Sequence, residues 1–108
     1  MGTNTFTNAQ AVGVTGVTTV YQAPANKDSI ILELDIANTI VSAVSVSAEV
    51  VDDSASTNAY IVKDAPVPVG GALQVISGQK VILETGDSIR VTASGACDVI
   101  CSILEDVN

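Results

Sequence analysis

The residues that could do chemistry in this chain are carboxylates and cysteines, because it contains no histidine. The usual general base, the Ser-His-Asp and Cys-His arrangements and the commonest zinc ligand are therefore absent. The densest acidic positions are the neighbours Asp52 and Asp53 and the alternating pair Glu33 and Asp35. Both pairs fall where solvated charge is ordinary, which argues against paired-carboxylate catalysis. The sequence predicts a protein that is not an enzyme and that uses no cofactor.

Two weak signals for a metal or redox site lie elsewhere. Asp52, Asp53 and Asn58 offer oxygen ligands of the kind that Ca²⁺ prefers, but their spacing matches no recognised calcium loop and favours a solvated turn. Cys97 and Cys101 are four residues apart; on a strand their Cα atoms would be about 13 Å apart, too far for a disulfide. We predict no metal site and two buried, free thiols, which fits synthesis in a reducing cytoplasm.

Charge and hydropathy argue against a nucleic-acid-binding or membrane protein. Four Lys and Arg stand against twelve Asp and Glu, giving a net charge of −8, and the four basic residues are scattered singly. Binding to nucleic acid or to an anionic membrane needs clustered positive charge, so we expect neither partner. The chain has no apolar run long enough for a membrane-spanning helix, and its first residues do not resemble a signal peptide.

The chain alternates in the manner of β-strands. Residues 80–94 contain two period-2 runs around Thr85-Gly86-Asp87, which predicts a β-hairpin. Residues 29–38 show the clearest alternation, with a predicted core face of Ile30, Leu32, Leu34 and Ile36. The shared face of the hairpin would consist of Val81, Leu83, Ile89, Val91 and Ala93.

Other strands are expected at 14–22, 44–50, 59–63, from residue 73, and over 97–105. Hydrophobic residues make up 47% of the chain but aromatic residues only 3%, so the core must consist of Val, Ile, Leu and Ala. We predict an all-β fold: a single β-sandwich of about eight short strands over residues 12–108, either immunoglobulin-like or jelly-roll-like.

Two segments could contact a partner. Residues 1–11 are polar apart from Phe6 and read as a flexible N-terminal arm, which either stays disordered or orders on a neighbouring subunit with Phe6 as its anchor. The segment from Pro66 to Val69 reads as a crossing segment or sheet edge, because proline cannot donate to a ladder. Its apolar side chains are either exposed for contact or tucked under the sandwich edge. The candidate contact residues are Phe6, Pro66, Val67, Pro68 and Val69.

Residues 20–38, 64–94 and 97–105 together resemble small β-sandwich virion proteins of tailed bacteriophages. In that family a Tyr-x-Ala-Pro turn feeds a long strand, an Ala-Pro-x-Pro-x-Gly-Gly crossing follows, and a Leu-Glu-x-Gly-Asp hairpin comes late. The matching positions are Tyr21, Ala23 and Pro24, then Ala65, Pro66, Pro68, Gly70 and Gly71, then Leu83, Glu84, Gly86 and Asp87.

The resemblance implies a structural component of the virion, made in the host cytoplasm. Such proteins decorate the capsid surface as cement proteins, commonly as trimers, or belong to the tail, tail fibre or baseplate. The chain is short and acidic and has no coiled-coil or collagen-like stalk, which favours capsid decoration. The implied partners are the major capsid protein, or other virion proteins, and further copies of the chain as a homotrimer.

An alternative from another class is a carbohydrate-binding β-sandwich module. Sugar sites in such folds usually offer aromatic platforms, whereas this chain has no tryptophan and two tyrosines. The composition therefore favours the structural role.

Overall fold

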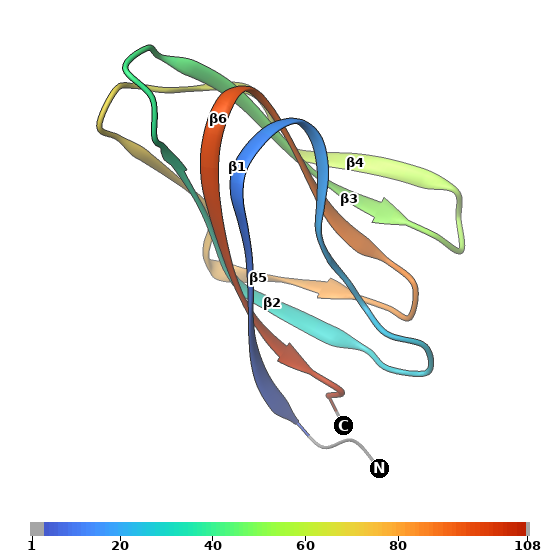
Figure 1. Ribbon diagram of the computed structural model, residues 1–108. Coiled ribbons are helices and arrows are strands. Elements are labelled where there is room, and N and C mark those ends of the chain that lie inside the picture. Colours follow the sequence, from blue (N-terminus) through green and yellow to red (C-terminus); the bar gives the residue numbers. More distant parts are fainter. Residues whose placement is uncertain (1–3, 108) are drawn as a thin grey trace.

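The computed structural model describes residues 4–107, which form one curled antiparallel sheet without helices (Figure 1). Its six strands are β1 (Thr5–Gln22), β2 (Ser29–Asn38), β3 (Val44–Asp52), β4 (Thr57–Val67), β5 (Ala72–Leu83) and β6 (Ser88–Glu105). The strand order is β4-β3-β6-β2-β5, with β1 also paired to β6. The all-β class predicted from the alternation is therefore confirmed.

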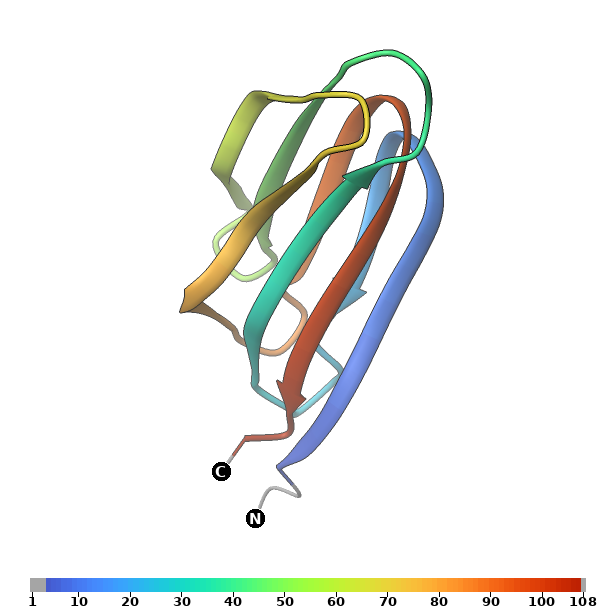
Figure 2. The same cartoon turned by 90° about the vertical axis from the view of Figure 1, so that its left-hand side faces the viewer.

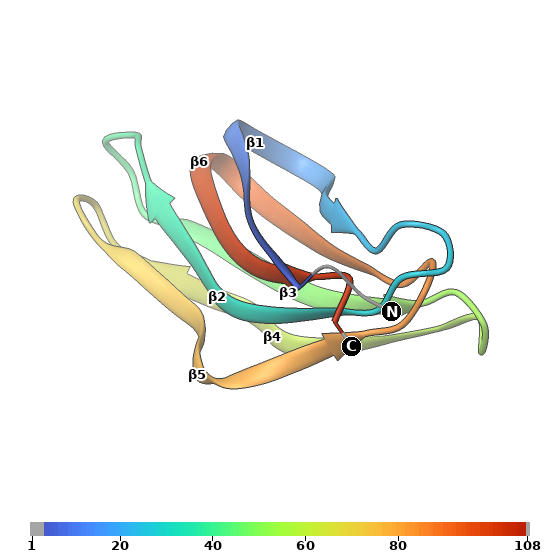
Figure 3. The same cartoon turned by 90° about the horizontal axis from the view of Figure 1, so that it is seen from below.

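Strand β6 organises the sheet, because it pairs along its whole length. Its first part, residues 88–93, pairs with β3, and its second part, residues 97–105, pairs with β2. β1 runs along the other edge of both parts. Figures 1 and 3 show β1 and β6 together as an arch, with β2 and β5 extending one leg and β3 and β4 the other. Figure 2 shows β5, β2, β6 and β1 side by side.

Glycines lie where the arch bends. In β1, Gly13 and Gly16 adopt φ values of 66° and 75°, in the left-handed region that glycine enters without a steric cost, and the register with β6 shifts there. In β6, a Cβ at Gly95 would lie 2.8 Å from Ile40 Cδ1 and 2.9 Å from Val44 Cγ1. Gly95 therefore lets the bend of β6 approach the start of β3 closely.

The inner face of the curled sheet holds the core, to which β6 contributes most. Apart from Gly95, alternate β6 residues from Ile89 to Ile103 are almost completely buried, and both cysteines belong to this series as free thiols. This confirms the prediction that the thiols pack as small hydrophobic groups. The largest fully buried side chains are aliphatic: Ile31, Leu34, Ile36, Ile76, Leu83, Ile89 and Ile103.

The core face of β2 differs from the prediction in its first half. Ile31, not Ile30 or Leu32, is fully buried, whereas Leu34 and Ile36 are buried as expected. A β-bulge causes the difference: Ile31 lies opposite Ile103 and Glu33 opposite Ser102, so Leu32 is an extra residue. Because side chains alternate with period two, one extra residue exchanges the two faces of the strand.

The predicted hairpin over 80–94 was wrong in its pairing. The turn exists, with the Asp87 N–H donating to the Glu84 carbonyl at 2.9 Å, and Leu83, Ile89, Val91 and Ala93 are buried. However, β5 pairs with β2 and β6 pairs with β1, β2 and β3, so the turn joins the two legs of the arch. The predicted runs 89–93 and 97–105 are a single strand, as are the runs on both sides of Gly78, which reduces the expected eight strands to six.

The N-terminal segment forms part of the sheet in this structure. In place of the flexible arm expected over residues 1–11, residues 5–11 are the start of β1 and lie opposite residues 105–99 of β6. Residues 1–3 of that arm lie outside the described part. Asn8 and Gln10 on the exposed outer positions, together with Thr5 and Thr7, gave this strand the appearance of a loop, while Ala9 and Ala11 pack against the core.

Candidate interaction site

The carboxylates between β3 and β4 are engaged in turn formation. Asp52 Oδ1 accepts hydrogen bonds from the Ala55 N–H at 3.1 Å and from the Ser54 hydroxyl at 2.9 Å. The Ala55 N–H, followed by the Ser54 hydroxyl, lowers the pKa of Asp52. Within residues 4–107, no three His, Cys, Asp or Glu side chains come together in a way that could hold a metal ion. The loop that was weighed as a Ca²⁺ site is thus a turn closed by hydrogen bonds to Asp52.

Glu33 and Asp35 point outward from β2, as predicted, and interact with each other. Desolvation, followed by hydrogen bonding to Glu33, raises the pKa of Asp35 to about 6. Asp35 Oδ1 is shielded from solvent and has no hydrogen-bond partner among the described residues. Two carboxylates on one strand face are best accommodated when one of them keeps its proton.

The cysteines are chemically inaccessible. Burial raises the pKa of the Cys101 thiol to about 12 and also raises that of Cys97. The thiolate is the reactive and metal-binding form of cysteine, so neither side chain is suited to nucleophilic or redox chemistry.

Two of the motifs that carry the phage resemblance meet in the structure. The Ala23 N–H donates to the Asp87 carbonyl at 2.9 Å, and the Gly86 N–H donates to the Ala23 carbonyl at 3.2 Å. The buried Asp87 carboxylate accepts from the Glu84 N–H and from the Asp53 N–H, each at 3.1 Å. These motif residues therefore hold three loops together at the open end of the arch, and their role is structural.

The proline segment at the other end is mixed in its exposure. Val67 is fully buried at the end of β4, whereas Pro66 and Pro68 are exposed and Val69 is 57% exposed. Among the residues that the structure describes, β4 pairs with β3 alone, which agrees with the edge position expected from its proline. Of the two interpretations of this segment, burial holds for the Val67 side chain and exposure for Val69.

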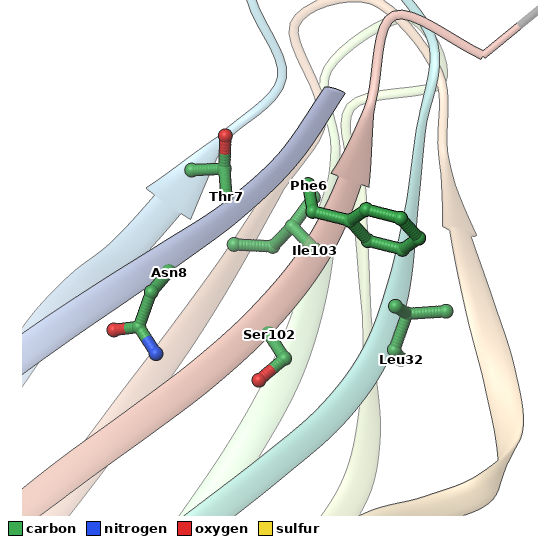
Figure 4. Close-up of a pocket in the computed structure, with 6 residues that line it drawn as sticks. All are labelled: Phe6, Thr7, Asn8, Leu32, Ser102 and Ile103. Carbon is green, nitrogen blue, oxygen red and sulfur yellow. The ribbon is translucent and has the colours of Figure 1, made fainter. Parts of the chain in front are cut away.

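Phe6 lies on the outer face of the sheet and is 77% exposed. It is opposite Leu104 of β6, and Ile30 and Ile82 continue the same cross-strand row on β2 and β5. Figure 4 shows its ring reaching across β6 towards Leu32. Beside the ring lies a shallow hollow of about 330 Å³, lined by Phe6, Thr7, Asn8, Leu32, Ser102 and Ile103.

The structure does not bring the two predicted contact segments together. Phe6 lies level with Ile30, at the start of β2, whereas the Val67 carbonyl accepts a hydrogen bond from Asn38, at the end of β2. The exposed apolar residues that sequence reasoning missed include Val12, Val17, Val41 and Ile82, at 80%, 64%, 92% and 68% exposure. Alternation in β1 could have indicated the first of these, had residues 5–11 been recognised as a strand.

Comparison with solved structures finds proteins with a similar fold. The chain is similar to one in the acid-stable capsid of Helicobacter pylori bacteriophage KHP30, at a TM-score of 0.56 and 13% identity, covering 95% of this chain and 86% of that one. It also matches a pentameric capsid protein from metagenomic phage sequences at a TM-score of 0.47 and 13% identity, covering 92% of this chain and 61% of that one. No protein-family model and no curated protein matches it. The fold is therefore one found in a phage capsid.

The part of the chain that the structure describes contains no helix long and apolar enough to cross a membrane.

Proposed function

We propose that the chain is a structural protein of a bacteriophage virion that decorates the outside of the capsid and stabilises the shell. The observation that carries the proposal is the likeness, over 95% of the chain, to a chain of the KHP30 capsid. The turn motifs shared with small phage virion proteins point the same way. Asp52 is engaged in a turn and both cysteines are buried, which supports a protein that acts by binding and not by catalysis.

Its binding surfaces are the exposed apolar residues at the two ends of the arch. Phe6 presents an aromatic ring beside a hollow on the outer sheet face, and Pro66, Pro68 and Val69 present a second contact at the far end of β2. Val67 supports this second contact from beneath, because its side chain is in the core. Two separated contacts suit a protein that bridges neighbours in a shell.

The partners are the major capsid protein and further copies of the chain, in a trimer as the family resemblance implies. Attachment through several weak contacts raises the effective affinity steeply. Dispersed capsid subunits lack the composite surface, so binding to the assembled shell stabilises it by mass action.

The test uses shells from the phage that encodes the chain, assembled without it. Added protein should sediment with these shells and raise the temperature at which they release their contents. Val69→Asp should reduce the bound fraction, because it places a charge in the proposed apolar contact. The matched control is Val17→Asp, a comparably exposed position in the second half of β1 and outside both proposed contacts. Shells that bind none of the added protein would contradict the decoration role. Shells that bind Val69→Asp as well as the native chain would contradict the proposed contact at Val69.

A further inference from the structure

We propose that β1 pairs along its free edge with the same edge of a second copy of the chain, antiparallel and centred on Ala9. This two-fold contact requires no capsid partner and goes beyond the decoration role. It extends the sheet continuously from one copy into the next.

The described sheet has three edges, and two of them are protected. β4 carries Lys63, Asp64 and Pro66, with Asp64 at a φ of 51°. β5 is interrupted between Ser77 and Val81, where the Gln79 side chain accepts from the Ser77 N–H at 2.9 Å and donates to the Val75 carbonyl at 3.0 Å. Charges, proline and bulges of this kind are the means by which proteins prevent edge-to-edge pairing.

The third edge, that of β1, has neither charged residues nor proline. Within residues 4–107, β1 pairs with β6 alone. The first charged residue of the sequence is Lys27 and its first proline is Pro24. The stretch from Phe6 to Val12 is a regular edge with two large apolar side chains exposed. Such an edge is a template for another strand.

Charge favours a second copy as the occupant. The chain carries a net charge of −8, all of it after residue 26, so two copies repel each other over most surfaces that they could bring together. The sequence of β1 contains no charged residue. Two acidic copies that pair along β1 therefore place no charged side chains of this strand opposite each other.

The sequence of β1 is also complementary to itself. Phe6, Asn8 and Gln10 share the outer face, since they lie opposite Leu104, Ser102 and Ile100 and these alternate with buried β6 residues. In an antiparallel pair centred on Ala9, Phe6 of one copy faces Val12 of the other, and Asn8 faces Gln10. Aromatic–β-branched pairs and amide pairs are both favourable across strands.

The paired segment ends at Val12 for a structural reason. Gly13 follows in a left-handed conformation, and its N–H donates to Asp98 Oδ1 of β6 at 3.0 Å. The register with β6 shifts at the same place, which bends the strand into the arch. The contact is therefore a seven-residue ladder, short enough to be reversible and dependent on concentration.

Disulfide formation tests the register directly. Asn8→Cys and Gln10→Cys together should give a covalent dimer with two bridges under mild oxidation, because directly opposed residues have Cβ atoms about 4.5–5.5 Å apart. Each single variant should stay uncrosslinked, since diagonal neighbours are about 7–8 Å apart, and the native cysteines are buried. Both positions are exposed, so folding should be unaffected.

A second measurement avoids introduced cysteines. Light scattering of the native chain should show two-fold association that increases with concentration, and Val12→Lys should weaken it about tenfold, because two symmetry-related contacts are lost. If the native chain forms trimers through another surface, the same pair of cysteines should join two trimers. The proposal is overturned if the double variant gives no specific crosslink, if the single variants crosslink equally well, or if Val12→Lys leaves the association unchanged.

Discussion

The side-chain amide of Asn38 donates a hydrogen bond to the carbonyl oxygen of Val67 at 3.1 Å, joining the end of β2 to the end of β4. The same nitrogen donates to the Ser42 carbonyl at 2.8 Å, and Asn38 Oδ1 accepts from the Ile40 N–H at 2.9 Å. One buried side chain thus positions both the β2–β3 loop and the proline segment. The proposed contact surface around Val69 depends on it.

Asn38→Ala should therefore destabilise the protein by about 1–3 kcal/mol, because partly or fully buried backbone groups lose their partners. Asn38→Asp should be at least as harmful, since it keeps the acceptor but loses both donated hydrogen bonds. Urea unfolding measures the change, with Gln74→Ala as the exposed control. Equal stability of the Asn38→Ala and native chains would show that water replaces the amide at no cost.

The carboxyl pair on β2 should make stability depend on pH. The folded state holds the Asp35 proton up to a pKa of about 6, above the ordinary value of 3.8. Unfolding therefore releases this proton between about pH 4 and pH 6, and the contribution of Asp35 to stability falls as the pH rises through this window. Asp35→Asn should stabilise the protein above pH 6, by on the order of 1 kcal/mol after allowance for solvent screening, and should have no effect below about pH 4.

Thermal unfolding at pH 4 and at pH 7.5 checks this expectation. Asp28→Asn makes the same chemical change at an exposed position and should leave the melting temperature nearly unchanged at both pH values. An Asp35→Asn variant that gains no stability at pH 7.5 would contradict the argument.

Gly95 is the position where a single methyl group should disrupt the arch. Its Cβ would approach Val44 Cγ1 to 2.9 Å, and Val44 is buried with a stiff β-branched side chain. We expect Gly95→Ala to cost about 1–3 kcal/mol through overpacking. The double variant Gly95→Ala with Val44→Ala should be more stable than the sum of the two single changes predicts. Strict additivity of the two changes would exclude a clash with Val44.

Tyr21 links three strands through its hydroxyl group. The hydroxyl donates to Glu105 Oε2 at 2.7 Å and shares a hydrogen bond with Ser29 Oγ at 2.9 Å. Desolvation, followed by the bond to Glu105, raises the pKa of Tyr21 to about 12. Tyr21→Phe should lower the free energy of unfolding by about 1–2 kcal/mol, whereas Tyr60→Phe, at an exposed position, should change it little. Similar losses for the two variants would mean that the Tyr21 hydroxyl group has no special role.

The strand content of this fold follows from local pattern, but the pairing does not. The alternation in residues 29–38 predicts β2 with the bounds that the structure has, because branched apolar residues recur at every second position. The bulge at Leu32 cannot be read from that pattern, since apolar residues stand on both sides of it. The turn at Gly86 is visible, yet the partners of the strands beside it depend on how the whole chain bends.

The candidate site shows the same division. An exposed Phe6 and a partly exposed proline segment could be expected from composition, because apolar residues there stand among polar or turn-forming neighbours. Their separation by the length of β2 is a property of the tertiary fold. The free edge of β1 needs both kinds of information: the absence of charge before Lys27 is in the sequence, while the pairing of β1 with β6 alone is in the structure.

The most direct test of the proposed function is the number of copies of the chain in purified virions of the phage that, under this proposal, encodes it, measured by quantitative mass spectrometry against the major capsid protein. A decoration protein should be present at a ratio near one, or at a simple fraction of it, which corresponds to hundreds of copies. A few copies to a few dozen would contradict capsid decoration and place the chain in the tail or its fibres. Its absence from the virion would refute the structural role altogether.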